Sequence, residues 1–220
     1  MTQLPSPQLK IGLIGRICSG KDTVGEVLIK TLGYQRFAFG DPIRSVYQVY
    51  LDGGWQPAFE LLCLYSDTIA RFTTTATTFK DIANSSPTRR EFLQKVGTWA
   101  RQLDDDIWVR TTFRQLPYLV QGYGVGAVCT DVRRRREYEV LRDAGFKFIH
   151  VTAPEAIRRE RMLARDASAD TSVFGHVSEQ EIDEIGKMAH ATVENDEGKA
   201  KLLTATFEAI DTIRQSFFTP

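Results

Sequence analysis

Short apolar runs alternate with amphipathic stretches along most of this 220-residue chain. The apolar runs predict buried strands at about 10–15, 35–39, 124–130, 147–152 and 191–194. Helical spacing and helix-start signals predict helices at about 21–32, from 41, at 58–71, 88–102, 106–121, 133–144, 154–165, from 178 and at 196–217. Strands that alternate with helices are typical of the α/β class, in which right-handed crossovers build a parallel, doubly wound sheet.

Three places interrupt this pattern. Residues 52–57 (DGGWQP) predict a turn, and Pro117 predicts a break in the helix at 106–121. The Thr-rich stretch 73–78, followed by NSSPT at 84–88, predicts a long, mobile connection.

The first strand runs into a glycine-flanked loop, IGLIGRICSGKDTVG at 11–25. Gly15, Gly20 and Lys21 fit the phosphate-loop pattern G-x-x-x-x-G-K-[ST], but Asp22 stands at the hydroxyl position and Thr23 comes one place late. We expect positive φ at both glycines. Backbone N–H groups and the helix start would then hold a phosphate, with the lysine on the β/γ-phosphates of a nucleoside triphosphate. The alternative is a glycine-rich turn with a surface lysine.

Composition narrows the class of protein. Lys and Arg number 28 and Asp and Glu number 28, so no global basic field favours nucleic acid and phosphate attraction has to be local. Three cysteines without CxxC spacing favour a reducing, cytoplasmic setting. No apolar run of 18 residues and no leader pattern is present, so we expect neither a membrane span nor a targeting peptide.

Charged residues follow the predicted strands, where parallel sheets bind ligands. Asp131 ends the strand at 124–130 and would hold Mg²⁺ or its waters, or else cap a helix. Arg133 just beyond it would touch a phosphate. Asp41 and Arg44 follow the second strand, where an arginine suits phosphate, although an i,i+3 surface ion pair is the alternative.

Arginines also gather on two predicted helices. Arg89, Arg90 and Arg101, with Gln94 between them, would clamp an acceptor phosphate or lie on a solvated helix face. The helix at 154–165 carries Arg158, Arg159, Arg161 and Arg165 before a predicted loop at 166–177. These arginines form either a lid over transferring phosphates or an exposed charged face.

Six segments together resemble a known family. They are SGKDT at 19–23, FAFGDPIR at 37–44, RREFLQKVGTWAR at 89–101, DDDIWV at 104–109, TDVRRRREYEVLRDAGFKFIHV at 130–151 and HVSEQE at 176–181. In this order they resemble the deoxynucleoside monophosphate kinase family, within the P-loop nucleotide kinases that include phosphomevalonate kinase and dephospho-CoA kinase. An acid before the threonine, as at Asp22, is normal in this branch.

The resemblance implies transfer of the γ-phosphoryl group of ATP, with Mg²⁺, to a (deoxy)nucleoside monophosphate, giving the diphosphate and ADP. The alternatives are a kinase for another small phosphorylated metabolite, or a non-catalytic nucleotide-binding module. It also implies one three-layer P-loop kinase domain over 1–220, as a monomer or homodimer. Its core would be about 10–40, 124–153 and 190–217, with a helical acceptor-binding insert at about 41–120 and an Arg-rich lid at about 154–185.

Site residues carry over position by position. The implied ATP-binding residues are Gly15, Arg16, Cys18, Ser19, Gly20, Lys21, Asp22, Thr23, Arg158 and Asn195. The implied acceptor-binding residues are Asp41, Arg44, Arg89, Arg90, Gln94, Arg101 and Arg133. The implied catalytic residues are Lys21, Asp131, Arg158 and Arg161, and the implied metal ligands are Asp22, Thr23 and Asp131. Because a triphosphate repels a bare carboxylate, Asp22 is expected to act through Mg²⁺ or its waters. Cys18 is either a small loop filler or a redox-sensitive thiol.

Overall fold

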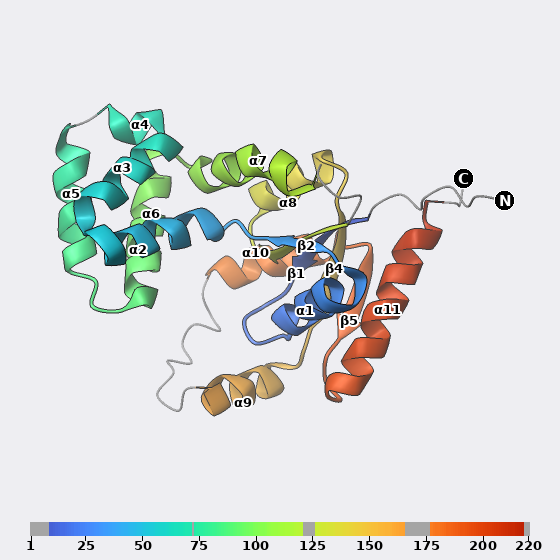
Figure 1. The fold of residues 1–220 in the computed structure, drawn as a ribbon. Helices are drawn as coiled ribbons and strands as arrows, with labels where there is room; N and C mark the ends of the chain where they lie inside the picture. Colours follow the sequence, from blue (N-terminus) through green and yellow to red (C-terminus); the bar gives the residue numbers. More distant parts are fainter. Residues whose placement is uncertain (1–8, 72, 121–125, 166–176, 218–220) are drawn as a thin grey trace. The chain divides into compact units, whose positions relative to one another are not determined.

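The computed structural model describes residues 9–71, 73–120, 126–165 and 177–217. Contacts divide the chain into two compact units. One, here called the sheet unit, consists of Met1–Ala38 and Tyr118–Pro220; the other, the helical unit, is Phe39–Pro117. Figure 1 shows the elements of both units.

The sheet unit is built on five parallel strands in the order β2-β3-β1-β4-β5. They are β1 Lys10–Ile14, β2 Gln35–Phe37, β3 Ala127–Val132, β4 Lys147–Thr152 and β5 Ala191–Glu194. The prediction of a parallel, doubly wound α/β sheet is therefore confirmed. The central strand β1 is buried almost throughout, as expected of a strand covered on both faces.

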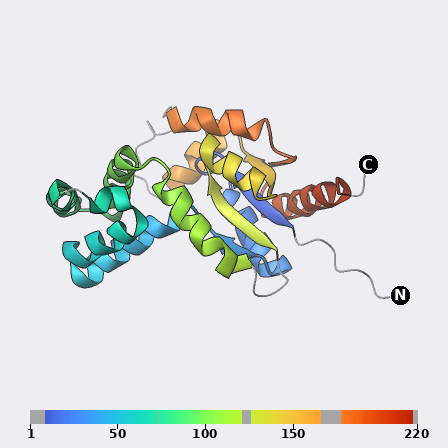
Figure 2. The same ribbon diagram turned by 90° about the horizontal axis from the view of Figure 1, so that it is seen from above.

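Helices cover both faces of this sheet (Figures 1 and 2). On one face, α1 (Lys21–Leu32) and α11 (Lys199–Gln215) pack in a core that includes Leu13, Leu28 and Ile210. On the other face lie α8 (Arg135–Asp143) and α10 (Val177–Gly186), where the ring of Tyr138 is 4.2 Å from that of Phe148. The sheet unit also contains helix α9 (Glu155–Arg165), which follows β4.

The helical unit contains helices only among its described elements. They are α2 Asp41–Gly53, α3 Trp55–Tyr65, α4 Asp67–Ala70, α5 Thr73–Asn84, α6 Arg89–Leu103 and α7 Ile107–Val120, of which the last three residues belong to the sheet unit. Their core is rich in aromatic rings, with Phe79 and Phe92 fully buried and 6.3 Å apart. Trp108 is buried beside them, and its indole N–H donates to the Gly97 carbonyl over 3.2 Å.

The predicted mobile connection at 73–78 is wrong, because this stretch begins helix α5. Threonine has a low helix propensity, but tertiary packing overrides it here. Phe79 and Ala83 of α5 are fully buried, and the hydroxyl of Thr75 donates to the Ile69 carbonyl over 2.8 Å.

Two predicted interruptions are also smaller than expected. The turn at 52–57 shrinks to Gly54, whose φ of 82° separates α2 from α3. Helix α7 continues past Pro117 to Val120, since a proline removes only one backbone hydrogen bond near the end of a helix. Within the described residues, no helix is both long and apolar enough to cross a membrane.

Candidate functional site: the P-loop of the sheet unit

The loop from Gly15 to Gly20 joins the central strand β1 to helix α1. Gly20 has the expected positive φ, 96°, and no side chain caps the first turn of α1. Its backbone N–H groups therefore suit an anion, and the helix dipole adds to the attraction.

The expectation of a positive φ at Gly15 is wrong. Positive φ is found at Gly20 and at Cys18 (59°), but not at Gly15. Glycine is needed at 15 for space instead, because a Cβ there would lie 2.7 Å from both the Ser19 hydroxyl and the Val151 carbonyl oxygen. The Ser19 hydroxyl is buried and has no hydrogen-bond partner among the described residues. Such groups are rare, and a bound phosphate is the kind of partner that would satisfy one.

Lys21 is the central charge of this loop, and its side chain is only 8% exposed. Its ammonium group donates to the Thr130 carbonyl over 2.7 Å and lies 3.5 Å from a carboxylate oxygen of Asp22. Burial lowers the pKa of Lys21, Arg133 lowers it further, and the carboxylates of Asp22 and Asp131 oppose that shift. A buried lysine so placed is under-solvated and favours a new anionic partner.

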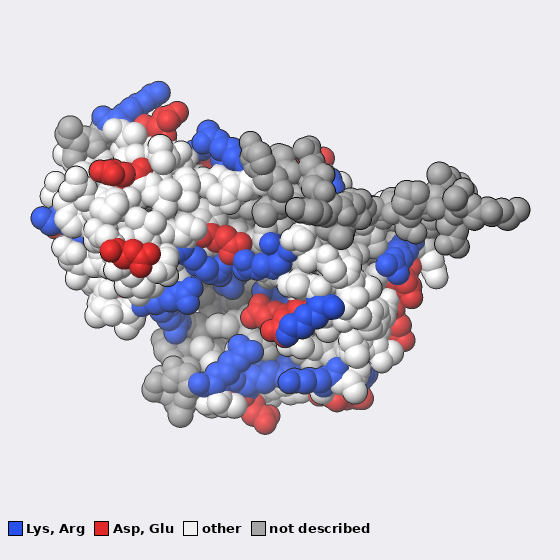
Figure 3. Space-filling view, in the orientation of Figure 1, with Lys and Arg blue, Asp and Glu red and all other residues white. Residues whose placement is uncertain are grey.

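A small cavity opens over the loop. It measures about 90 Å³ and is lined by residues 15–22 together with Arg133, Arg165 and Ile182. That is about three times the share of one water in the liquid, about 30 Å³, which is the scale of a phosphoryl group rather than of a whole nucleotide. In Figure 3, Lys and Arg side chains gather over α9 at the lower edge of the sheet unit.

Arg158 and Arg161 of α9, together with Asn195 directly after β5, hold the P-loop by hydrogen bonds. The amide of Asn195 donates to the Ser19 carbonyl over 2.8 Å, and Arg161 donates to the Asn195 side chain over 3.1 Å. Arg161 also reaches the Cys18 carbonyl at 3.4 Å, while the buried Arg158 donates to Ala153 at 3.2 Å and to Ile17 at 3.5 Å. Arg158 and Arg161 of the predicted lid therefore contact the P-loop, and Asn195 is engaged with protein atoms. Arg159 instead forms an ion pair of 2.8 Å with Glu155 of the same helix.

On the other side of the loop, Arg16 is paired with Asp183 of α10. Its Nε donates to the carboxylate over 2.8 Å, and a second guanidinium nitrogen completes a bidentate ion pair. The hydrogen bond from Arg16, which outweighs the effect of burial, lowers the pKa of Asp183. This pair anchors Arg16 at the rim of the cavity that it lines.

Oxygen ligands that would suit Mg²⁺ lie around Lys21. The Asp22 side chain is 78% exposed, and Asp131 at the end of β3 interacts with the Lys21 charge from the other strand. Among the described residues, no group of three or more His, Cys, Asp or Glu forms a closed metal site. Mg²⁺ commonly takes one or two carboxylates and completes its shell with waters and phosphates, so Asp22 and Asp131 fit this ion as partial ligands. A role for Thr23 as a metal ligand stays a prediction.

The expected acceptor residues other than Arg133 lie in the helical unit. Arg44 and Asp41 form an ion pair of 2.8 Å at the start of α2. On α6, a Cβ at Gly97 would lie 3.0 Å from Ile43 and 3.9 Å from the guanidinium of Arg101, so the two helices approach closely there.

The remaining expected acceptor residues sit at the other end of α6. Arg89 and Arg90 are exposed in its first turn, and Gln94 is exposed one turn later. Arg90 precedes Arg101 by 11 residues, or about 17 Å of helix. That these residues bind one acceptor phosphate stays a prediction.

Comparison with known proteins gives a family. Residues 11–185 match the AAA_18 family model, described as an AAA domain, and the chain belongs to this family. No curated protein sequence matches it significantly.

Solved structures show the same fold at low identity. TT1252 from Thermus thermophilus aligns at 19% identity and a TM-score of 0.54, covering 94% of this chain and 97% of its own. A gluconokinase from Sinorhizobium meliloti aligns at 16% and 0.52, covering 98% of both chains. A dephospho-CoA kinase from Campylobacter jejuni aligns at 14% and 0.50, covering 94% and 97%. The chain thus has the α/β fold of P-loop kinases; the acceptor is not fixed by these likenesses.

Two residues at the site had no role in the sequence-based assignment. Asp183 pairs with Arg16, and Ile182 beside it lines the cavity. Neither belongs to a recognisable motif, and 167 residues separate the two partners of the ion pair. The segment with His176 and the loop at 166–176 lies outside the described residues, as do the side chains of 177–180.

Proposed function

We propose that this protein transfers the γ-phosphoryl group of ATP to a small phosphomonoester, with a (deoxy)nucleoside monophosphate as the acceptor. The observation that carries the proposal is the buried ammonium group of Lys21, set between the Thr130 carbonyl and Asp22 at the open start of α1. A positive charge with so little water around it stabilises charge that develops on a transferring group.

In the proposed reaction, an oxygen of the acceptor's phosphate bonds to the γ-phosphorus as the bond from that phosphorus to the bridging oxygen of ADP breaks. Such an oxygen is ionised at neutral pH and needs no strong base. Catalysis then rests on positioning and charge neutralisation. Lys21 serves the transferring group, while Arg158, Arg161 and Asn195 keep the loop carbonyls in place. Mg²⁺, held in part by Asp22, Thr23 and Asp131, would neutralise charge on the phosphates.

The acceptor is tested by measuring ADP release, in a coupled assay, over a panel. The panel contains deoxynucleoside and ribonucleoside monophosphates, phosphomevalonate, dephospho-CoA and gluconate, the last two suggested by the solved neighbours. We expect Mg²⁺-dependent turnover with a nucleoside monophosphate at least tenfold above every other acceptor in kcat/KM. If another phosphorylated metabolite is turned over instead, the proposal of a nucleoside monophosphate as the acceptor is wrong, and that metabolite is the acceptor. ATP binding without turnover on any acceptor would favour a nucleotide-binding module.

A further inference from the structure

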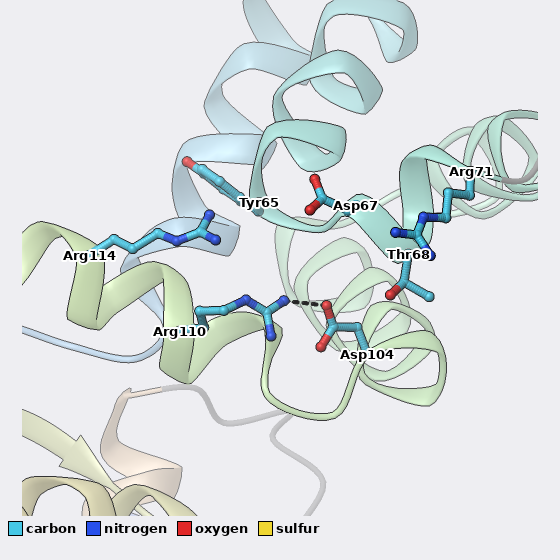
Figure 4. Close-up of a pocket in the computed structure, with 7 residues that line it drawn as sticks. All are labelled: Tyr65, Asp67, Thr68, Arg71, Asp104, Arg110 and Arg114. Atoms are coloured by element: carbon cyan, nitrogen blue, oxygen red, sulfur yellow. Dashed lines mark hydrogen bonds and ion pairs between the residues drawn. The ribbon is translucent and has the colours of Figure 1, made fainter.

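The helical unit has a cavity of its own, which the proposed reaction leaves without a role. It measures about 260 Å³. Seven residues line it, from the end of α3 and from α4 with the residue after it, from the end of α6 and from the first eight residues of α7 (Figure 4): Tyr65, Asp67, Thr68, Arg71, Asp104, Arg110 and Arg114. Small-molecule sites typically measure about 300–1,000 Å³, so this cavity suits one small ligand.

Arg110 is held rigidly at the cavity wall. It forms an ion pair with Asp104, whose carboxylate is 11% exposed and also accepts a hydrogen bond of 2.5 Å from the buried hydroxyl of Ser66. Burial opposes ionisation of Asp104, but the hydrogen bonds from Arg110 and Ser66 outweigh it and lower the pKa. The guanidinium is therefore pre-positioned by a carboxylate that stays ionised at neutral pH.

The charge in the cavity is not balanced. Both lining carboxylates, Asp104 and Asp67, act on Arg110. The guanidinium groups of Arg71 and Arg114 form no hydrogen bond or ion pair with any residue that the structure describes. In Figure 4 these two side chains extend from opposite sides toward the same space. The guanidinium groups of Arg71 and Arg114 and the hydroxyl of Thr68 are hydrogen-bond donors. Together they offer more donors than a single carboxylate group can accept, and they match a phosphate group with three terminal oxygens.

We propose that this cavity binds the phosphate group of a small phosphomonoester, with Arg71 and Arg114 as its charged ligands and Arg110 as the fixed wall. The site stands on the helical unit alone. That the bound molecule is the acceptor rests on the proposed transfer reaction; the other source is a phosphorylated effector.

Residue-resolved NMR tests binding without any turnover. Inorganic phosphate is titrated into the full protein while backbone amide shifts are followed. Amides of 65–71 and 104–114 report this cavity, and those of 15–23 report the P-loop. We expect saturable shifts in the first group, with a dissociation constant separate from that of the P-loop. No saturable shift at 65–71 and 104–114 overturns the proposal, whatever happens at the P-loop.

Matched variants assign the charges. Arg114→Gln removes an exposed fork that carries no ion pair among the described residues, so it leaves the fold intact. We expect about tenfold weaker phosphate binding at the cavity and unchanged binding at the P-loop. Lys95→Gln removes one positive charge from α6, away from the cavity, and should leave both affinities unchanged. Equal affinity in Arg114→Gln and wild type, or equal weakening in both variants, overturns the assignment.

Kinetics then separates the two sources of the phosphate. If the ligand is the acceptor, Arg114→Gln raises the KM of the acceptor about tenfold and leaves that of ATP unchanged. If the ligand is an effector, the KM values stay unchanged, and added phosphomonoester alters the rate in wild type but not in Arg114→Gln. A protein without kinase activity would still show the NMR titration, so failure of the proposed function is distinguishable from failure of this site.

Discussion

Lys21 is buried in the P-loop, where we propose that it contacts the transferring group. The effect of replacing Lys21 on activity can be measured separately from its effect on stability. We predict that Lys21→Met lowers kcat by about 100-fold or more, the scale found when one transition-state donor is removed. The melting temperature should stay within a few degrees, because an apolar side chain of similar length replaces a charge that is costly to bury. ADP release and thermal unfolding measure the two effects. Lys30→Met, which removes an exposed lysine of α1, is the control and should keep full activity.

The proposed role of Asp22 in binding Mg²⁺ can also be tested by a single substitution. Its carboxylate is exposed beside Lys21, where a triphosphate would repel it unless a cation intervened. We therefore predict that Asp22→Asn shifts the Mg²⁺ concentration for half-maximal activity upward several-fold and lowers kcat. Titrating Mg²⁺ at fixed ATP measures both, and Glu26→Gln on the same helix is a control. An unchanged Mg²⁺ profile would remove Asp22 from the metal site.

Single residues differ in how far the sequence reveals them. Lys21 and Gly20 could be assigned because a P-loop is contiguous and its spacing carries the geometry. The support of that loop could not, because Asn195 reaches Ser19 across 176 residues and Arg16 reaches Asp183 across 167. Neither pair has a local signal. Asn195 was expected among the ATP-binding residues, and its side-chain amide donates to the P-loop backbone at Ser19.

At the scale of elements, the start of α1 depends on the fit between Gly20 and Asn195. A Cβ at Gly20 would lie 1.9 Å from the Asn195 side-chain nitrogen, and the φ of 96° is unfavourable for any L residue with a side chain. We predict that Gly20→Ala destabilises the protein by more than the roughly 1–3 kcal/mol of backbone strain alone and abolishes ATP binding. Urea unfolding and nucleotide titration measure these effects.

Gly33 at the other end of α1 provides the control for strain. It too has positive φ, 68°, but nothing lies within 4 Å of its Cβ position, so Gly33→Ala measures strain without a clash. The clash itself is isolated by a double-mutant cycle with Asn195→Ala. The change in unfolding free energy of the double variant is compared with the sum of the changes in Gly20→Ala and Asn195→Ala. If the two are equal, the two side chains do not compete for space.

The elements themselves were predictable to different degrees. The strands and α1 follow from contiguous apolar runs, helix spacing and Gly33 as a stop signal. Helix α5 did not, since its threonines argue against a helix and only contacts far along the chain decide the outcome. The same holds for α7 at Pro117. Local sequence therefore identifies the sheet more reliably than the helical unit.

At the scale of the whole molecule, a net charge of zero coexists with Lys and Arg side chains that cluster over α9 (Figure 3). The overall charge therefore predicts that no global basic field attracts nucleic acid. It does not predict where the positive clusters lie. Arg71, Arg110 and Arg114 come from two separate stretches of sequence, and only the packing of helices brings them to one cavity. Their convergence is a tertiary property, which single-sequence spacing does not encode.

We expect the pH dependence of the stability of the whole protein to include a contribution from one unusual carboxyl group, that of Glu137 in α8. Burial and the neighbouring Asp131 raise its pKa to about 7, although it accepts hydrogen bonds from the backbone N–H groups of Arg133 and Arg134. The unfolded chain loses this proton near pH 4.5, so the folded state binds more protons between about pH 4.5 and 7. The contribution of Glu137 to stability is therefore complete below pH 4.5 and is lost as the pH rises through 7.

Two histidines act in the opposite sense, so the prediction concerns a difference between variants. Burial lowers the pKa of His150 and of His190, which makes stability rise with pH in the same range. In Glu137→Gln the amide oxygen still accepts from the backbone, and the histidines are unchanged. We predict that the free energy of unfolding of wild type minus that of Glu137→Gln falls steadily between pH 5 and pH 7.5, measured by urea unfolding. Asp131→Asn should reduce this slope, because it removes the neighbouring charge. A difference that is flat or rises over this range would show that Glu137 ionises as an ordinary surface carboxyl group.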